Sequence, residues 1–303
     1  MLRRMAPARR RQGRVWLRDY GGDGPTVLLV PSLINPPYIL DLMPGRSLAR
    51  WIAAQGHRTW LLDWGTPSPA DAELDLTGHV ERLLLPLIAR LPEPPILIGY
   101  CLGGTMSVAA STRARVAGLA TIAAPWHFDG YGADTLAGMA ALWEAARLPC
   151  QQLGLVPMEV LQAGFWKLDP ARTVAKYEAF SRAEGEAAEM FVAMEDWANT
   201  GAPLTYAAGA ELFEALLARN VSGRGQWRVG GALAVPSNLD CPAVEFVSLH
   251  DRIVPAATAI GLGQRHDLHA GHVGMVVGSG ARAQLWEPLG RWLRALKRSQ
   301  TGG

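Results

Sequence analysis

The chain has 303 residues, of which 49% are hydrophobic and 18% are charged, so it can bury a full core and is neither a disordered nor a coiled-coil sequence. Its formal net charge of +2 gives no general attraction to nucleic acid. Three scattered cysteines and no C-x-x-C pair exclude a disulfide framework and a cysteine-based metal site. We therefore expect a globular protein with no nucleic-acid partner and no bound metal.

Arginine is concentrated at the start of the chain, where the sequence has little apolar pattern. We expect residues 1–20 to form a basic, disordered tail; a segment that anchors the protein to a surface is the alternative. Residues 21–303 are of a length typical of a single domain. The start has no apolar run like that of a secretory signal, and no run reaches the length of a transmembrane segment. We therefore expect a cytoplasmic protein.

Strands and helices are predicted to alternate over the first part of this domain. Apolar runs indicate buried strands at Thr26–Leu33, Thr59–Asp63, Ile96–Ile98 and Leu119–Ala124. Helices are predicted between them at Ser47–Gln55, Leu74–Leu91 (with a kink at Pro86) and Gly104–Ser111. The alternation predicts an α/β fold with a mostly parallel sheet and helices on both faces.

The pattern changes at about residue 125. From there to about residue 236 the sequence is helical in character, rich in tryptophan and methionine, and without a clear buried strand. Strand character returns at Val244–Leu249 and near Asp267, and Ala281–Lys297 is predicted to be a closing helix. We interpret residues 125–236 as a helical cap inserted into a single sheet domain.

The motif G-Y-C-L-G at residues 99–103 lies directly between a predicted strand and a predicted helix. This context indicates the nucleophile elbow of an α/β-hydrolase fold, with Cys101 at a tight turn and Gly99 and Gly103 keeping the turn free of side chains. Gly104 would let the helix pack close to the strand. The helix N-terminus is expected to lower the pKa of the Cys101 thiol and favour the thiolate. An inert buried cysteine is the alternative.

A catalytic acid and base are predicted in later loops. On this fold the order along the chain is nucleophile, acid and histidine. Asp251 follows the strand Val244–Leu249, at the carboxyl end where such sheets gather catalytic groups, and His272 lies in a later loop between small residues. We expect His272 to act as general base toward Cys101 and Asp251 to orient its imidazole ring.

The other histidines are assigned structural roles. Hydrogen bonding within loops is expected for His250, His266 and His269. Surface positions are expected for His57 and His79, and His127 is a weaker candidate for lining the pocket.

An oxyanion hole is expected from two backbone N–H groups. One belongs to Leu102, the residue after the nucleophile, and the other to the loop after the first strand, where Leu33 is our candidate. Backbone donors leave no side-chain signature, so the assignment of Leu33 depends on its position alone.

Several short motifs, taken in order, resemble one enzyme family. They are V-P-S-L-I-N at residues 30–35, D-W-G-T-P at 63–67, G-Y-C-L-G-G-T at 99–105, D-R-I-V-P at 251–255 and G-H-V at 271–273. Together they are similar to the catalytic domain of poly(3-hydroxyalkanoate) synthases, which belong to the α/β-hydrolase superfamily. The likeness runs from about Val27 to Trp292, nearly the whole expected domain.

The resemblance implies growth of a polyester from (R)-3-hydroxyacyl-coenzyme A. Cys101 would hold the acyl group as a thioester, and His272 would help to deprotonate the attacking hydroxyl group, an effect worth roughly 10²–10⁴-fold. Coenzyme A is then part of the substrate, and no separate cofactor is expected. The implied partners are this substrate, the polyester product and either a second copy of the chain or a partner subunit, in the cytoplasm on polyester granules.

The cap is expected to form a hydrophobic acyl tunnel that excludes water. Its large apolar side chains are Trp126, Trp143, Phe165, Trp166, Met190 and Met194. The alternative is that each of these side chains belongs to the core of the cap itself.

Two other functions are kept as alternatives. A cysteine-dependent hydrolase of the same fold, such as a thioesterase, a polyester depolymerase or a dienelactone-hydrolase-like enzyme, would use water as the acceptor. The inserted cap and the D-W-G-T-P turn favour the synthase. A non-catalytic relative that binds granules or partners is the second alternative, and the joint presence of Cys101, Asp251 and His272 argues against it.

Overall fold

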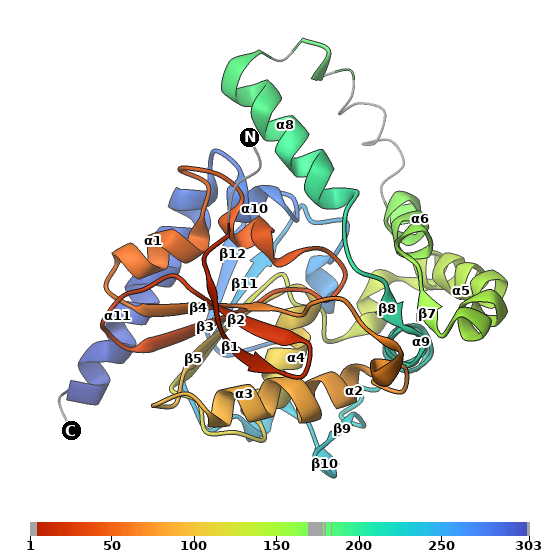
Figure 1. The fold of residues 1–303 in the computed structure, drawn as a ribbon, viewed down its shortest axis with the longest axis horizontal. Helices are drawn as coiled ribbons and strands as arrows, with labels where there is room; N and C mark the ends of the chain where they lie inside the picture. The colour runs from red at the N-terminus through yellow and green to blue at the C-terminus, as the bar shows by residue number, and fades with distance from the viewer. Residues whose placement is uncertain (1–4, 169–177, 179, 183, 302–303) are drawn as a thin grey trace.

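The computed structural model describes residues 5–168, 178, 180–182 and 184–301. At its centre is an eight-stranded sheet (Figure 1). Its strands are β1 (Ala8–Gln12), β2 (Val15–Asp19), β3 (Thr26–Val30), β4 (Arg58–Asp63), β5 (Ile96–Tyr100), β6 (Gly118–Ile122), β11 (Ala243–Ser248) and β12 (Arg265–Leu268). The order is β1-β2-β4-β3-β5-β6-β11-β12, antiparallel from β1 to β4 and parallel from β4 to β12. The prediction of a mostly parallel sheet is confirmed.

Helices cover both faces of this sheet. On one face lie α1 (Leu48–Ala54), α10 (Gly274–Val277) and α11 (Glu287–Thr301), and on the other lie α2 (Leu76–Gly78), α3 (Leu85–Ala89) and α4 (Leu102–Ser111). Consecutive residues of a strand point to opposite faces, so Leu28 packs in the core with α4 and Leu29 in the core with α11. Because β3, β5 and β6 are buried on both sides, their sequences are nearly continuous apolar runs.

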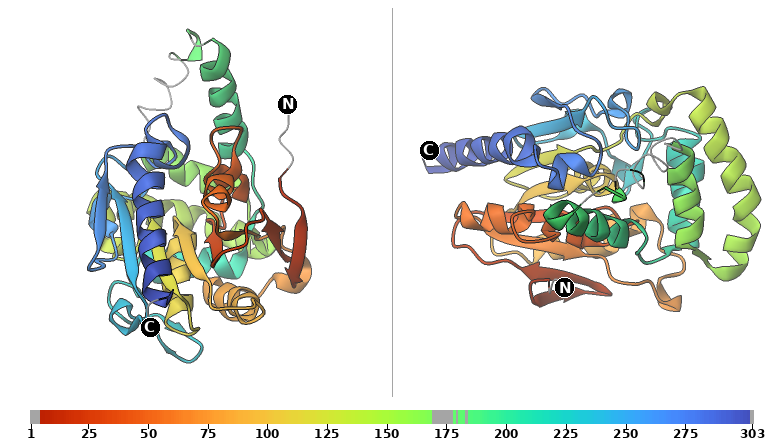
Figure 2. Two further views of the ribbon diagram at one scale, coloured as in Figure 1. Left: turned by 90° about the vertical axis from the view of Figure 1, so that its left-hand side faces the viewer. Right: turned by 90° about the horizontal axis from the view of Figure 1, so that it is seen from above.

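The cap lies between β6 and β11 and is mainly helical. Its elements are α5 (Ala133–Leu153), β7 (Leu155–Val156), α6 (Met158–Leu168), α8 (Gly185–Ala198), β8 (Leu204–Thr205), α9 (Tyr206–Ala210), β9 (Arg228–Val229) and β10 (Ala232–Leu233). Figure 2 shows α5 and α6 at the end of the molecule opposite α11, with α8 projecting beyond the sheet. The antiparallel pairs β7–β8 and β9–β10 were not expected, because two-residue strands are too short to produce an alternating pattern. No helix in the described residues is both long and apolar enough to cross a membrane.

The start of the chain is part of the sheet, so the expectation of a disordered tail over residues 1–20 is wrong for residues 8–19. β1 and β2 form a hairpin, and Val15 and Leu17 of β2 are completely buried. Arg14 donates a hydrogen bond from Nε to the carbonyl of Trp64 at 3.0 Å. The arginines hid the strand pattern, because an edge strand needs few apolar side chains and is often protected by charge.

The expected surface positions of His57 and His79 are also wrong, since both side chains are buried. Burial lowers the pKa of His79 to about 4, so its ring is neutral. Nδ1 can then donate to the carbonyl of Asp75 at 2.6 Å, while Nε2 accepts from Arg14 at 2.6 Å. His79 therefore ties the helix to the start of the chain.

The helix predicted at Leu74–Leu91 changes its hydrogen-bond pattern before Pro86. Between α2 and α3 lies a π-helical turn, His79–Leu84, in which the N–H of Leu85 bonds to the carbonyl of Val80. Proline has no N–H and its ring crowds the preceding turn. A wider turn is one of the ways in which a helix accommodates this, and the structure has it at the place where a kink was predicted.

Candidate active site

Cys101 lies at a sharp turn between β5 and α4. Its backbone has φ 55° and ψ −132°, a combination that a residue with a side chain rarely adopts. The N–H of Cys101 bonds to the carbonyl of Ile122 in the neighbouring strand at 2.9 Å, which holds the strained residue in place. The elbow predicted from the G-Y-C-L-G motif is therefore present, and it puts the thiol at the N-terminus of α4.

Three glycines around this turn are needed for space. A Cβ atom on Gly99 would lie 2.4 Å from the Cα of Gly104, and one on Gly104 would lie 2.4 Å from the Cβ of Ala124. A Cβ atom on Gly103 would lie 2.2 Å from the carbonyl oxygen of Val30. The close approach of backbone segments, as expected, excludes side chains at these positions.

Replacing Gly103 by alanine is expected to destabilise the protein by about 3 kcal/mol, because the new methyl group meets backbone atoms that cannot rotate away. The matched control is Gly138→Ala in α5, where a Cβ atom would have no neighbour within 4 Å. Alanine is the better helix former, so this control is expected to stabilise by up to about 1 kcal/mol. Urea unfolding of both variants measures the difference, and two changes of the same sign would contradict the role given to Gly103.

The predicted acid and base come together beside the thiol. Nδ1 of His272 donates to Oδ2 of Asp251 at 2.6 Å, and the side chain of Asp251 is completely buried. The other carboxylate oxygen accepts the N–H groups of Ile253 and Val254 at 2.8 and 3.0 Å, which fixes the direction of the carboxylate. His272 and Cys101 line the same cavity, so the imidazole ring lies on the same side of the site as the thiol. The structure thus brings together three residues that are far apart in the sequence.

The charges in this cluster favour a protonated His272. Burial by itself lowers the pKa of this histidine, but the negative charges of Asp251 and Cys101 and the hydrogen bond to Asp251 raise it to about 10. The ring also stacks on Tyr100, with centroids 5.1 Å apart, and the Tyr100 hydroxyl donates to the His272 carbonyl at 3.2 Å. Both contacts hold the imidazole in one orientation, as a general base requires.

The proposed oxyanion donors are close to the thiol in the fold. Leu102 is the first residue of α4, and Leu33 follows β3 in the loop that packs against Gly103. Among the described residues neither N–H has a hydrogen-bond partner. Two unpaired donors near a nucleophile would suit a developing negative charge. The assignment of Leu33 and Leu102 stays a prediction.

The other candidate histidines lie away from the reacting atoms. His266 stacks on Phe246 with centroids 5.1 Å apart, and His250 lies beside His269 with centroids 5.7 Å apart. His127 is not among the residues that line either cavity at Cys101. Within the described part of the chain, no group of three or more histidine, cysteine or acidic side chains is arranged to hold a metal ion.

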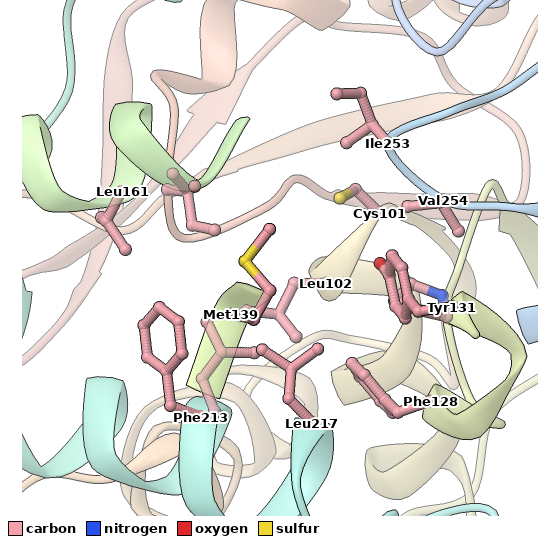
Figure 3. Close-up of a pocket in the computed structure, with 14 residues that line it drawn as sticks. Cys101, Leu102, Phe128, Tyr131, Met139, Leu161, Phe213, Leu217, Ile253 and Val254 are labelled. Atoms are coloured by element: carbon pink, nitrogen blue, oxygen red, sulfur yellow. The ribbon is translucent and has the colours of Figure 1, made fainter. Parts of the chain in front are cut away.

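Two cavities of different chemistry meet at Cys101. The first takes in about 670 Å³ of space, part of it open to solvent. Its lining, shown in Figure 3, is almost entirely apolar and includes Phe128, Tyr131, Met139, Leu161, Phe213 and Leu217. The second takes in about 820 Å³ of space, part of it open to solvent, and its lining is also mostly apolar in area. We call it the polar cavity because it carries the polar side chains of Ser32, Asn35, Tyr100, Gln162, Asn199 and His272. The thiol is therefore accessible from an apolar side and from a polar side.

None of the large apolar side chains expected to form a tunnel, among those that the structure describes, lines either cavity. Trp126 and Trp143 are buried, and Trp143 stacks on Phe213 with centroids 4.8 Å apart. Met190 and Met194 pack against the main core and line neither cavity. The side chains of Phe165 and Trp166 lie outside the described residues.

Sequence reasoning missed the tyrosines of the site. Tyr100 belongs to the G-Y-C-L-G motif, but nothing in the motif indicates that it supports the His272 ring. Tyr131 lies in the turn Phe128–Tyr131 shortly after β6 and lines the apolar cavity. Its place just beyond the carboxyl end of a strand was the available signal.

Comparison with curated proteins finds relatives of one kind, and no family model matches the chain. Poly(3-hydroxyalkanoate) polymerase subunit PhaC of Haloferax mediterranei is 31% identical over 294 residues, which are 91% of this chain and 59% of that protein. The subunit of Haloarcula marismortui is 30% identical over 289 residues, 88% of this chain and 60% of that protein. The subunit of Synechocystis sp. is 27% identical over 290 residues, 88% of this chain and 77% of that protein. The chain thus spans about three fifths of the first two relatives.

Solved structures similar to this one include esterases, lipases and a proline iminopeptidase. An esterase from Thermogutta terrifontis superposes with a TM-score of 0.57 at 16% identity, covering 98% of this chain and 99% of that one. An esterase from Exiguobacterium antarcticum gives 0.58 at 13% identity, covering 92% and 95%. At this identity the likeness concerns the fold alone, and the predicted α/β-hydrolase fold is confirmed.

Proposed function

From the homology of this chain to the poly(3-hydroxyalkanoate) polymerase family along 88–91% of its length, we propose that it is an acyltransferase which polymerises (R)-3-hydroxyacyl-coenzyme A through a thioester at Cys101. The observation that carries the proposal is a thiol at the junction of an apolar and a polar cavity, where the polar one is also lined by a histidine that is hydrogen-bonded to Asp251.

The first step is acylation of Cys101. The thiolate attacks the carbonyl carbon of the substrate thioester, and the oxyanion is held by the N–H groups proposed above. As the tetrahedral intermediate collapses, the bond to the coenzyme A sulfur breaks, and that sulfur takes the proton of the His272 imidazolium. The products are free coenzyme A and an acyl-enzyme. One thioester replaces another, so little free energy is lost and the acyl group stays reactive.

The second step transfers the acyl group to a hydroxyl group. The 3-hydroxyl of another unit, or of a growing chain, loses its proton to the now neutral His272 as its oxygen attacks the acyl carbon. The carbon–sulfur bond breaks and an ester bond forms. Because the histidine keeps the proton, the site returns to a thiolate–imidazolium pair. Asp251 stabilises the imidazolium in both steps without accepting a proton.

The two cavities determine the orientation of the bound substrate. His272 must reach the leaving sulfur and the attacking hydroxyl, so both groups belong in the polar cavity that this histidine lines. The acyl unit then belongs in the apolar cavity, whose lining offers water few hydrogen-bond partners near the thioester. Exclusion of water is what separates a polymerase from a hydrolase on the same fold.

Product analysis tests the proposal. Purified protein given (R)-3-hydroxybutyryl-coenzyme A is expected to release coenzyme A and to form insoluble polyester, measured by thiol titration and by chromatography of the methanolysed precipitate. The (S)-enantiomer serves as the matched control substrate and is expected to give no polymer. Free 3-hydroxybutyrate as the only product would assign the chain to the hydrolases instead.

The same proposal covers cofactors, assembly and location. The reaction uses only side chains, backbone donors and a substrate that brings its own coenzyme A, so it needs no resident cofactor. An insoluble product would keep the enzyme on the surface of polyester granules in the cytoplasm. Sedimentation of the purified chain distinguishes a homodimer from a monomer that needs a partner subunit.

A further inference from the structure

The Tyr131 hydroxyl is an isolated polar group in the apolar cavity. Among the described residues that line this cavity, it is the one side-chain hydrogen-bond donor apart from the Cys101 thiol. In Figure 3 the phenol end of Tyr131 points toward Cys101, on the same side of the cavity. Within the described part of the chain the hydroxyl makes no hydrogen bond. Tyr131 is half-buried, and a free donor at the wall of an apolar cavity is suited to an oxygen of a ligand.

The turn that carries Tyr131 is held firmly in place. The N–H groups of Trp126 and His127 bond to the carbonyl of Thr258 at 2.7 and 3.1 Å, which ties the turn to the loop after Asp251. A Cβ atom on Gly130 would lie 2.4 Å from the Ala257 carbonyl oxygen, so the two loops are in close backbone contact.

The far side of the turn is held by the cap. Phe128 donates its N–H to the side-chain oxygen of Asn220 at 2.8 Å. Phe128 also packs beside Tyr131, with ring centroids 6.1 Å apart. The position of the phenol is therefore set by the fold before any substrate arrives, as selective binding requires.

The phenol stays protonated, so its hydroxyl group can donate a hydrogen bond to a ligand oxygen. Burial raises the pKa of Tyr131 well above its usual value, and the negative charges of Cys101 and Asp251 raise it further.

We propose that Tyr131 binds the oxygen atom on C3 of the acyl unit and thereby makes the apolar cavity selective for 3-hydroxyacyl over unsubstituted acyl groups. The inference rests on the proposed function. An acyl group attached to Cys101 carries its C3 oxygen one methylene beyond the carbonyl carbon. In an apolar cavity that oxygen needs a hydrogen bond, since burying it unpaired is unfavourable. Tyr131 supplies the donor, and the aliphatic remainder of the unit packs on the apolar lining.

The test compares two substrates that differ in one oxygen atom. Single-turnover acylation of Cys101 is measured as coenzyme A release and as acyl-enzyme mass with (R)-3-hydroxybutyryl-coenzyme A and with butyryl-coenzyme A. The wild-type chain is expected to be acylated faster by the hydroxylated substrate. Tyr131→Phe removes only the hydroxyl group and is expected to lower this preference about tenfold, through slower acylation by the hydroxylated substrate alone.

A control tyrosine separates this role from a general loss of stability. Tyr20→Phe also removes a phenol hydroxyl, one that donates to Asp41 at 2.8 Å away from the site, and it is expected to keep the wild-type preference. Equal losses with both substrates in Tyr131→Phe, or a wild type without preference, would overturn the assignment of Tyr131 while acylation itself upheld the proposed function. If neither substrate acylated the wild type, the proposed function would fail first.

Discussion

Cys101→Ala is expected to abolish covalent labelling by a 3-hydroxyacyl-coenzyme A analogue and to lower the turnover rate by about 10⁶-fold. The thiol is the atom that forms the acyl-enzyme, and alanine leaves the elbow backbone without a nucleophile. Because the methyl group of alanine fits where the cysteine Cβ already lies, the fold is expected to persist. Intact-protein mass spectrometry after incubation with the analogue measures the loss directly.

Cys241 provides the matched control for this result. Burial, and then the charge of Asp240, raise the pKa of Cys241 to about 11, so this thiol stays protonated and weakly nucleophilic at neutral pH. Cys241→Ala is therefore expected to keep full labelling. Unchanged labelling of Cys101→Ala together with loss in Cys241→Ala would remove the nucleophile from the elbow, and with it the proposed mechanism.

Asp251→Asn is expected to lower the turnover rate by about 10⁴-fold while the binding of substrate changes little. Asparagine has the same shape as aspartate, but it carries no charge to stabilise the imidazolium and can hold the wrong tautomer of His272. The loss is expected in kcat, measured from the rate of coenzyme A release at saturating substrate. A matched control is Asp267→Asn, which breaks only an exposed ion pair with Arg265 and is expected to be nearly neutral.

The dependence of stability on pH checks the same variant independently of activity. His272 has a pKa raised from 6.5 to about 10 in the folded chain, so the native state binds its proton more tightly than the unfolded state. The stabilisation is then complete below pH 6.5 and is lost as the pH rises toward 10. The free energy of unfolding of the wild type is expected to fall over this interval, and that of Asp251→Asn to fall less. Parallel curves would show that Asp251 does not hold the charge of His272.

The elbow, Asp251 and His272 could be predicted because short stretches of sequence or the chain order indicate their positions. Strand, turn and helix are contiguous at residues 96–111, so the spacing of Gly99, Cys101 and Gly103 specifies the turn directly. Asp251 and His272 could be found because each lies in a loop beyond the carboxyl end of the sheet, and topology brings such loops together. In these cases a local pattern or a chain order was enough.

The sequence by itself determined the alternation of strands and helices, the position of the thiol and the likeness to one enzyme family. Only the tertiary structure decided that the arginine-rich start pairs with β4, that His79 is buried against Arg14, and that Tyr131 lies beside Cys101. The reason is physical: an edge strand or a cavity wall is formed by segments distant in the chain, and its stability comes from packing between them. The pattern of residues within one segment does not show which distant segment will pack against it.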